Sequence, residues 1–325
     1  MRPIPILVLL SLAGCAIHPR GEREERARAE RAGAPYSKPF EERDLPVLGP
    51  DASLEDSIRY ALLSNADLEA KFFDWKAAIE RIPQEASPPG TGAIAFSEVL
   101  NGGASLWNRT TLLLQTEPME NLPFPGKLAT AGRRALEEAR AAGLRFDRAR
   151  YALEAEVVRA FVEIAHHHEL VGLRQEEIAL LDRVASTAEA RTRSGSAPQQ
   201  DWLKARTELD LARNEIRNLE SEEPGLRARV NALLARAPDS RVDARLPEPR
   251  GLPFPDDQVF RVVAERNPEL AALAHEVEGR REALDLARKA YLPDFALSAG
   301  ITGGLSRMVG GMVTLPFLRR EAIEG

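Results

Sequence analysis

A seven-residue repeat of apolar positions runs through the middle of the chain, within a stretch free of proline, residues 126–193. This spacing places apolar side chains along one seam of an α-helix and is typical of coiled coils. At 1.5 Å per residue, such a helix would be about 100 Å long. The seam is formed by Val157, Ile164, Val171, Ile178 and Ala185.

A second helix is predicted after a short break at residues 194–198. Gly195 can take the positive φ that ends a helix, and Pro198 suits the first position of the next one. The second helix has its own heptad seam, so the pair predicts an antiparallel coiled-coil hairpin. Pro224 predicts a kink or a break within it. The second seam contains Ala212, Leu219, Leu226 and Leu233.

The segment before the long helix has a different pattern. Ser53 precedes acidic residues and helical spacing, which predicts an N-cap and a helix that ends near Pro83. Residues 93–97 and 110–116 then have the character of strands, with a glycine-rich turn expected at 101–103. The predicted order is therefore helix, two strands and long helix.

This order of elements occurs twice. The Ala-Asp-Leu-Glu-Ala segment after Asn65 matches Pro-Glu-Leu-Ala-Ala after Asn267, and residues 294–302 alternate between apolar and small or polar side chains. A return strand is expected at 308–315. The second copy reaches Gly325 where its long helix should begin, so we expect a C-terminally incomplete chain.

The repeat sets the expected boundaries. The first copy spans residues 51–236 and the second, incomplete copy spans 257–325. Between them, residues 237–256 contain five prolines and are predicted to be a linker.

The N-terminus has the parts of a secretory signal peptide, residues 1–14, followed by the single cysteine of the chain, Cys15. Leu-Ala-Gly-Cys is similar to a bacterial lipobox, in which the cysteine carries lipid such as palmitate. By the same resemblance, Ala16 after the cysteine favours the outer membrane over retention in the inner membrane. Residues 15–50 are mixed in charge and carry prolines, which predicts a lipidated, extended tether.

Composition narrows the candidate chemistry. A net charge of −6 disfavours nucleic acid as a partner, and one cysteine excludes disulfides and cysteine-based zinc sites. His166, His167 and His168 are consecutive, so on a helix their side chains diverge by about 100° and cannot share one ion. No catalytic constellation is recognisable, and we predict no enzyme activity, cofactor or metal site.

The duplicated unit and the lipobox together resemble the TolC-type outer-membrane efflux proteins. The resemblance covers about residues 50–320, and its most specific part is the hairpin tip, although Thr192 stands where the family usually has an aromatic residue. The tip reads Arg191-Thr192-Arg193-Ser194-Gly195 and then Asp201-Trp202-Leu203-Lys204-Ala205, and Asn231-Ala232-Leu233-Leu234 resembles the end of the second hairpin helix.

The resemblance implies a mainly α-helical fold with membrane β-strands, in which each chain of a homotrimer contributes four strands to a shared β-barrel and helices to a periplasmic tunnel. Four strands alone cannot close in lipid, which agrees with sharing. The implied function is the outer-membrane exit duct of a tripartite efflux pump, passing small molecules or metal ions from an inner-membrane pump through a periplasmic adaptor protein. The implied adaptor-docking residues are Arg191, Arg193, Gly195, Asp201 and Leu203.

Two other functions stay open. One is a periplasmic coiled-coil lipoprotein with a structural or adaptor role, and the other is an outer-membrane duct for protein secretion. Asp201 also has a simpler explanation, as an acid in the first turn of a helix. The apolar strand face at residues 295–301 favours the duct, because a periplasmic adaptor has no need of one.

Overall fold

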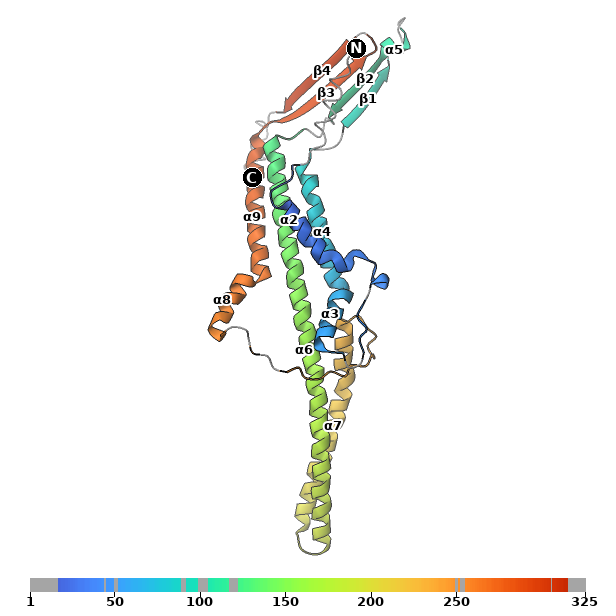
Figure 1. Ribbon diagram of the computed structural model, residues 1–325, viewed down its shortest axis with the longest axis vertical. Coiled ribbons are helices and arrows are strands. Elements are labelled where there is room, and N and C mark those ends of the chain that lie inside the picture. The colour runs from blue at the N-terminus through green and yellow to red at the C-terminus, as the bar shows by residue number, and fades with distance from the viewer. Residues whose placement is uncertain are drawn as a thin grey trace. The chain divides into compact units, whose positions relative to one another are not determined.

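The chain packs as two units. Figure 1 shows the helices and strands of the computed structural model. The first unit holds the described residues of Met1–Ala32, Lys71–Phe146 and Arg266–Gly325, and the second holds those of Gly33–Ala70 and Asp147–Glu265. The signal peptide, Cys15 and the expected turn at residues 101–103 lie outside the described residues. Described are residues 17–43, 45–49, 52–88, 92–98, 105–116, 122–248, 251, 255–304 and 306–314.

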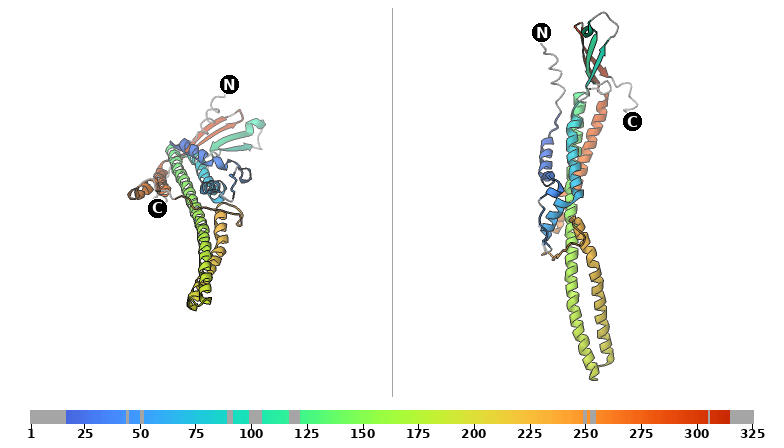
Figure 2. Two further views of the ribbon diagram at one scale, coloured as in Figure 1. Left: turned by 60° about the horizontal axis from the view of Figure 1, so that its bottom comes forward. Right: turned by 90° about the vertical axis from the view of Figure 1, so that its right-hand side faces the viewer.

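The coiled-coil hairpin forms as the heptads predict. Helix α6 (Pro125–Arg193) has 69 residues, and α7 (Gln199–Leu233) returns beside its end (Figure 2). Seam residues such as Ile164 and Ala212 are buried. The break considered at Pro224 is wrong, because α7 continues through it. Pro224 is exposed, so water can hydrate the carbonyl that its missing N–H leaves without a partner.

The two strand pairs join into one antiparallel sheet of order β1-β2-β3-β4. The central pairing joins the two repeats, and the hydroxyl oxygens of Thr111 and Thr302 lie 3.0 Å apart across it. A short helix, α5 (Leu106–Arg109), precedes β2. The strands are β1 (Gly92–Glu98), β2 (Thr110–Thr116), β3 (Asp294–Thr302) and β4 (Ser306–Thr314).

Asparagines divide the helical segments that precede each strand pair. Ser53 caps α3 (Leu54–Ser64) through a capping box with Asp56, as predicted. The helix was expected to be continuous, but Asn65 ends it and caps α4 (Ala66–Ala86), because its side-chain oxygen accepts a bond from the Leu68 N–H at 2.9 Å. In the second copy, Asn267 caps α9 (Pro268–Arg288) after α8 (Asp256–Arg266) in the same way.

Helix α4 runs past Pro83, where it was predicted to stop, and ends at Ala86. Proline has no N–H, so the carbonyl of Ile79 loses its helical partner. The Arg26 guanidinium donates to that carbonyl at 3.4 Å, and the Ile17 N–H donates to the Ala86 carbonyl at 3.2 Å. The N-terminal segment therefore satisfies the end of α4.

The extended tether predicted for residues 15–50 is wrong. Its charged part forms α2 (Glu22–Gly33), with three acids in the first turn, where they complement the helix dipole. Glu22 is buried and accepts bonds from His18 and Arg26, both at 2.8 Å. Burial raises the pKa of Glu22, but these hydrogen bonds outweigh burial and leave the pKa below its ordinary value.

Helix α2 packs against an aromatic core in the first unit. Trp75 is fully buried, stacks on Phe146 at a centroid distance of 5.8 Å, and donates its indole N–H to Glu25 at 2.9 Å. Gly143 makes this approach possible, since a Cβ there would lie 2.6 Å from the indole and 2.9 Å from the Glu25 carboxylate. The charged helix α2 is thus held by the buried hydrogen bond between Trp75 and Glu25, and the absence of a side chain at Gly143 leaves room for it.

We expect Gly143→Ala to lower the free energy of unfolding by about 1–3 kcal/mol, because the new methyl group overpacks the Trp75 site. Without such a clash, alanine stabilises a helix relative to glycine by about 1 kcal/mol, so the sign of the change in unfolding free energy distinguishes overpacking from helix propensity. Gly172→Ala is the control on the same helix, because a Cβ there meets no atom within 4 Å. Thermal unfolding should show the two substitutions moving the midpoint in opposite directions; equal midpoints would contradict the packing account.

The expected linker at residues 237–256 is packed in its first half. Asn231, which is fully buried in the second unit, donates to the carbonyls of Pro238 and Ser240 at 3.1 and 2.8 Å. Ala244 is also buried. The prolines predicted a linker without contacts to the helices. Instead, the Asn231 side chain near the end of α7 binds two carbonyls of this segment.

Candidate functional site

The tip of the hairpin is a Schellman turn. The Ser196 N–H donates to the Arg191 carbonyl at 2.9 Å, and the Gly195 N–H donates to the Thr192 carbonyl at 3.1 Å. Gly195 has φ +73°, the left-handed conformation predicted for it, and no atom lies within 4 Å of where its Cβ would be. The turn therefore needs glycine for its backbone and not for lack of space.

The predicted tip residues are exposed. Arg193 forms an ion pair with Glu189 at 2.6 Å one turn earlier, and its side chain is 78% exposed. Asp201 lies in the first turn of α7, and Leu203 follows with about half of its surface exposed. The structure thus brings Arg191, Arg193 and Gly195 into one turn and puts Asp201 and Leu203 at the start of the next helix. The lipidation candidate, Cys15, lies outside the described residues.

The four-stranded sheet has one apolar face. Leu112 pairs with Ile301, and Ala299 pairs with both Leu114 and Val309, so these side chains share a face. Many of them are exposed, Val309 by 82%. An exposed apolar patch of this kind marks a surface for membrane or protein contact. The face comprises Leu112, Leu114, Phe295, Leu297, Ala299, Ile301, Val309 and Val313, and Arg307 lies at its end.

Most residues of the opposite face are small or polar, but three larger apolar side chains lie among them. Thr111, Ser298 and Thr302 lie there together with Gly300 and Gly310. The larger side chains on this face are Leu113, Met308 and Met312. Alternation in β3 predicted the two faces of that strand, but the β2–β3 pairing that extends them over four strands had no local signal.

Lys127, near the start of α6, binds residues at and just before the start of β3. Lys127 Nζ lies 2.7 Å from the Asp294 carboxylate and 2.8 Å from the Leu292 carbonyl. A backbone bridge between Leu122 and Phe295 lies next to it. These contacts hold β3 to the segment that leads from β2 into α6, and sequence reasoning did not single them out.

The three histidines do not converge. His167 is buried within the coiled coil and His166 is exposed, whereas the His168 ring lies 3.4 Å from the Ala244 carbonyl. Within the part of the chain that the structure describes, no group of three His, Cys, Asp or Glu side chains could hold a metal ion. Across the same residues, no helix has both the length and the apolar character that a membrane span requires.

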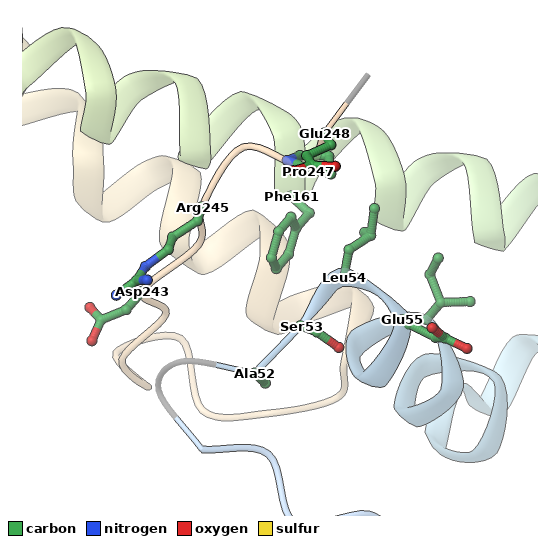
Figure 3. A pocket seen from close by; sticks show the side chains of 10 residues that line it. Ala52, Ser53, Leu54, Glu55, Phe161, Asp243, Arg245, Pro247 and Glu248 are labelled. Carbon is green, nitrogen blue, oxygen red and sulfur yellow. The ribbon is translucent and has the colours of Figure 1, made fainter. Parts of the chain in front are cut away.

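A cavity of about 940 Å³ opens in the second unit beside the N-terminus of α3 (Figure 3). The ring of Phe161 forms its inner wall, and Asp243 and Arg245 lie along the packed half of the linker. The Ser53 hydroxyl at its edge donates to Asp56 at 2.6 Å in the capping box. The Ser53 hydroxyl is therefore already bonded within the helix cap. The described lining residues include no histidine or cysteine that could activate it as a nucleophile.

Comparisons with known proteins agree on the fold. No family profile matches the chain. The fusaric acid resistance protein FusA from Burkholderia cepacia is 27% identical over 235 residues, which are 67% of this chain and 43% of FusA. Among solved structures, the outer-membrane channel OprN aligns with a TM-score of 0.66 at 16% identity, over 83% of this chain and 66% of OprN.

Two further structures give the same result. VceC, an outer membrane protein of Vibrio cholerae, aligns with a TM-score of 0.65 at 18% identity, over 84% of this chain and 70% of VceC. CusC, whose structures describe transmembrane channel formation, aligns with a TM-score of 0.65 at 15% identity, over 94% of this chain and 72% of CusC. The chain therefore has the fold of the TolC-type outer-membrane channels.

Proposed function

We propose that this chain forms part of the outer-membrane exit duct of a tripartite efflux pump. In this proposal the strands lie in the outer membrane, and the coiled-coil hairpin extends into the periplasm to meet an adaptor protein. An inner-membrane pump supplies the energy, and the duct itself is passive. Cys15 carries the lipid anchor.

The amphipathic sheet is the observation that carries the proposal. Its apolar face suits lipid, and its opposite face suits water. Among the described strands, β1 and β4 form the edges of the sheet and have no outer partner, and unpaired strand edges are not tolerated in hydrocarbon. Strands from further copies of the chain would pair with these edges, and three copies of four strands give an even number, as single-chain barrels of bacterial outer membranes have.

The cargo is proposed to be a small molecule. The relative FusA is named for fusaric acid resistance, which supports an organic compound for this chain. The chain spans less than half of FusA and about two thirds of OprN, so the proposal concerns the duct as a whole and this chain as its part.

Two neighbouring residues of β4 test the membrane role of the sheet. We expect Val309→Arg to reduce the amount of full-length protein in the outer membrane at least tenfold, since an arginine on a lipid-facing strand costs about 2–4 kcal/mol near the bilayer midplane. Met308→Arg is the matched control, because Met308 is 53% exposed on the opposite face. Urea-washed outer membranes and an immunoblot give the readout. Equal insertion of both variants would refute a lipid-facing role for the apolar face.

A further inference from the structure

A groove of about 370 Å³ lies in the first unit, where α4, α6 and α9 come together. Five of its lining residues have side chains no larger than a methyl group, so the backbones of the three helices are close to its surface; they are called the base here. These small apolar side chains leave room for a ring. The base residues are Ala78, Ala141, Ala142, Gly279 and Ala283.

The groove is on the side of α6 that faces away from the N-terminal segment. Gly143 faces α2, since a Cβ there would lie 2.9 Å from the Glu25 carboxylate. Ala141 lines the groove two residues earlier, a rotation of about 200° around the helix axis. Ala141 therefore faces away from α2, and no residue of α2 lines the groove.

Four arginines surround the base, and two of them are neutralised within the fold. Arg145 forms an ion pair with Glu276, and Arg134 forms ion pairs with Glu85 at 3.1 Å and with Glu138 at 3.7 Å. These pairs account for both carboxylates that line the groove.

The other two arginines have no such partner. Arg81 of α4 and Arg280 of α9 line the groove from different helices, and neither has an ion-pair partner among the described residues. Two guanidinium groups thus remain without an ion pair beside the Ala/Gly base. A guanidinium binds a carboxylate through two parallel hydrogen bonds and also stacks on aromatic rings.

We propose that this groove binds small aromatic carboxylates, with the ring on the Ala/Gly base and the carboxylate between Arg81 and Arg280. The volume suits a molecule of one or two rings. A bare inorganic anion would use the arginines but not the base, and a neutral ring would use the base but not the arginines. Both parts of the ligand are therefore needed.

The test is a titration of the purified full-length protein with 2-naphthoate, followed by isothermal titration calorimetry. We expect saturable binding that becomes at least tenfold weaker in Arg81→Gln combined with Arg280→Gln. Ala283→Leu, which fills the groove and leaves the arginines in place, should weaken binding similarly. Circular dichroism of each variant checks that the helices are intact.

The matched control is Arg281→Gln, one residue along α9. Arg281 is paired with Glu278 and does not line the groove, so its loss should leave the affinity unchanged. Inorganic phosphate and 2-naphthamide should each bind at least tenfold more weakly than 2-naphthoate. Equal binding of either compound, or undiminished binding by the double arginine variant, would overturn the proposal. Because binding is measured without export, this site and the duct function can fail separately.

Discussion

Export should fall to the level of a deletion strain when Gly195→Val and Arg193→Glu are combined in the full-length protein. A β-branched residue at φ +73° strains the Schellman turn by about 1–2 kcal/mol. The new glutamate faces Glu189 in place of an ion pair and puts a negative charge at the C-terminus of α6. Both changes alter the surface that we propose to dock the adaptor. Cargo accumulation in cells and crosslinking to the adaptor are the measurements.

Assembly should survive these substitutions, because the tip residues are exposed and the seam of the hairpin is unchanged. Arg206→Glu is the control, since Arg206 forms an exposed i,i+4 pair with Asp210 farther along α7 and should export normally. Normal export by the double tip variant would remove the docking role. Loss of the trimer would show that the tip is structural only.

Cys15→Ser should abolish lipid labelling and leave an uncleaved precursor, because the chain has no second thiol to accept lipid. Each buried CH₂ of an acyl chain contributes about 0.8 kcal/mol to membrane affinity, so the loss of several chains removes a firm anchor. Incorporation of radiolabelled palmitate and the mass of the N-terminal peptide are the measurements.

Ala16→Ser, next to the lipidation site, should be labelled and processed normally. Residual palmitate on the Cys15→Ser protein would show that the N-terminal motif is not a lipobox. Full processing without label would instead indicate an ordinary signal peptide.

Local patterns predicted the helices well because their causes are local. The seam from Val157 to Ala185 requires only that apolar residues recur on one helix face. The observed helix α6 (Pro125–Arg193) contains this seam. The turn at Gly195 needs only a residue that tolerates positive φ. For the same reason the tip residues were placed correctly, although their docking role stays a prediction.

Distant partners account for what the patterns missed. Pro83 looked like a helix end because the group that replaces its missing hydrogen bond comes from Arg26, more than fifty residues earlier. Residues 22–33 looked solvated because the buried partner of Glu25 is Trp75, fifty residues later. The two unpaired arginines of the groove come from α4 and α9, and only the packing of both on α6 brings them to one place.

Thr111 of β2 and Thr302 of β3 are 191 residues apart in the sequence, so β2 is synthesised well before its partner strand. At a synthesis rate of about 5–20 residues per second, β2 exists for about 10–40 seconds before β3 is made. During that interval β2 can pair with β1, but the edge that will pair with β3 is open and Leu112 and Leu114 have no neighbour on that side, a state prone to aggregate. The β1–β2 hairpin is therefore the part of the sheet that is exposed longest to self-association while the chain is being made.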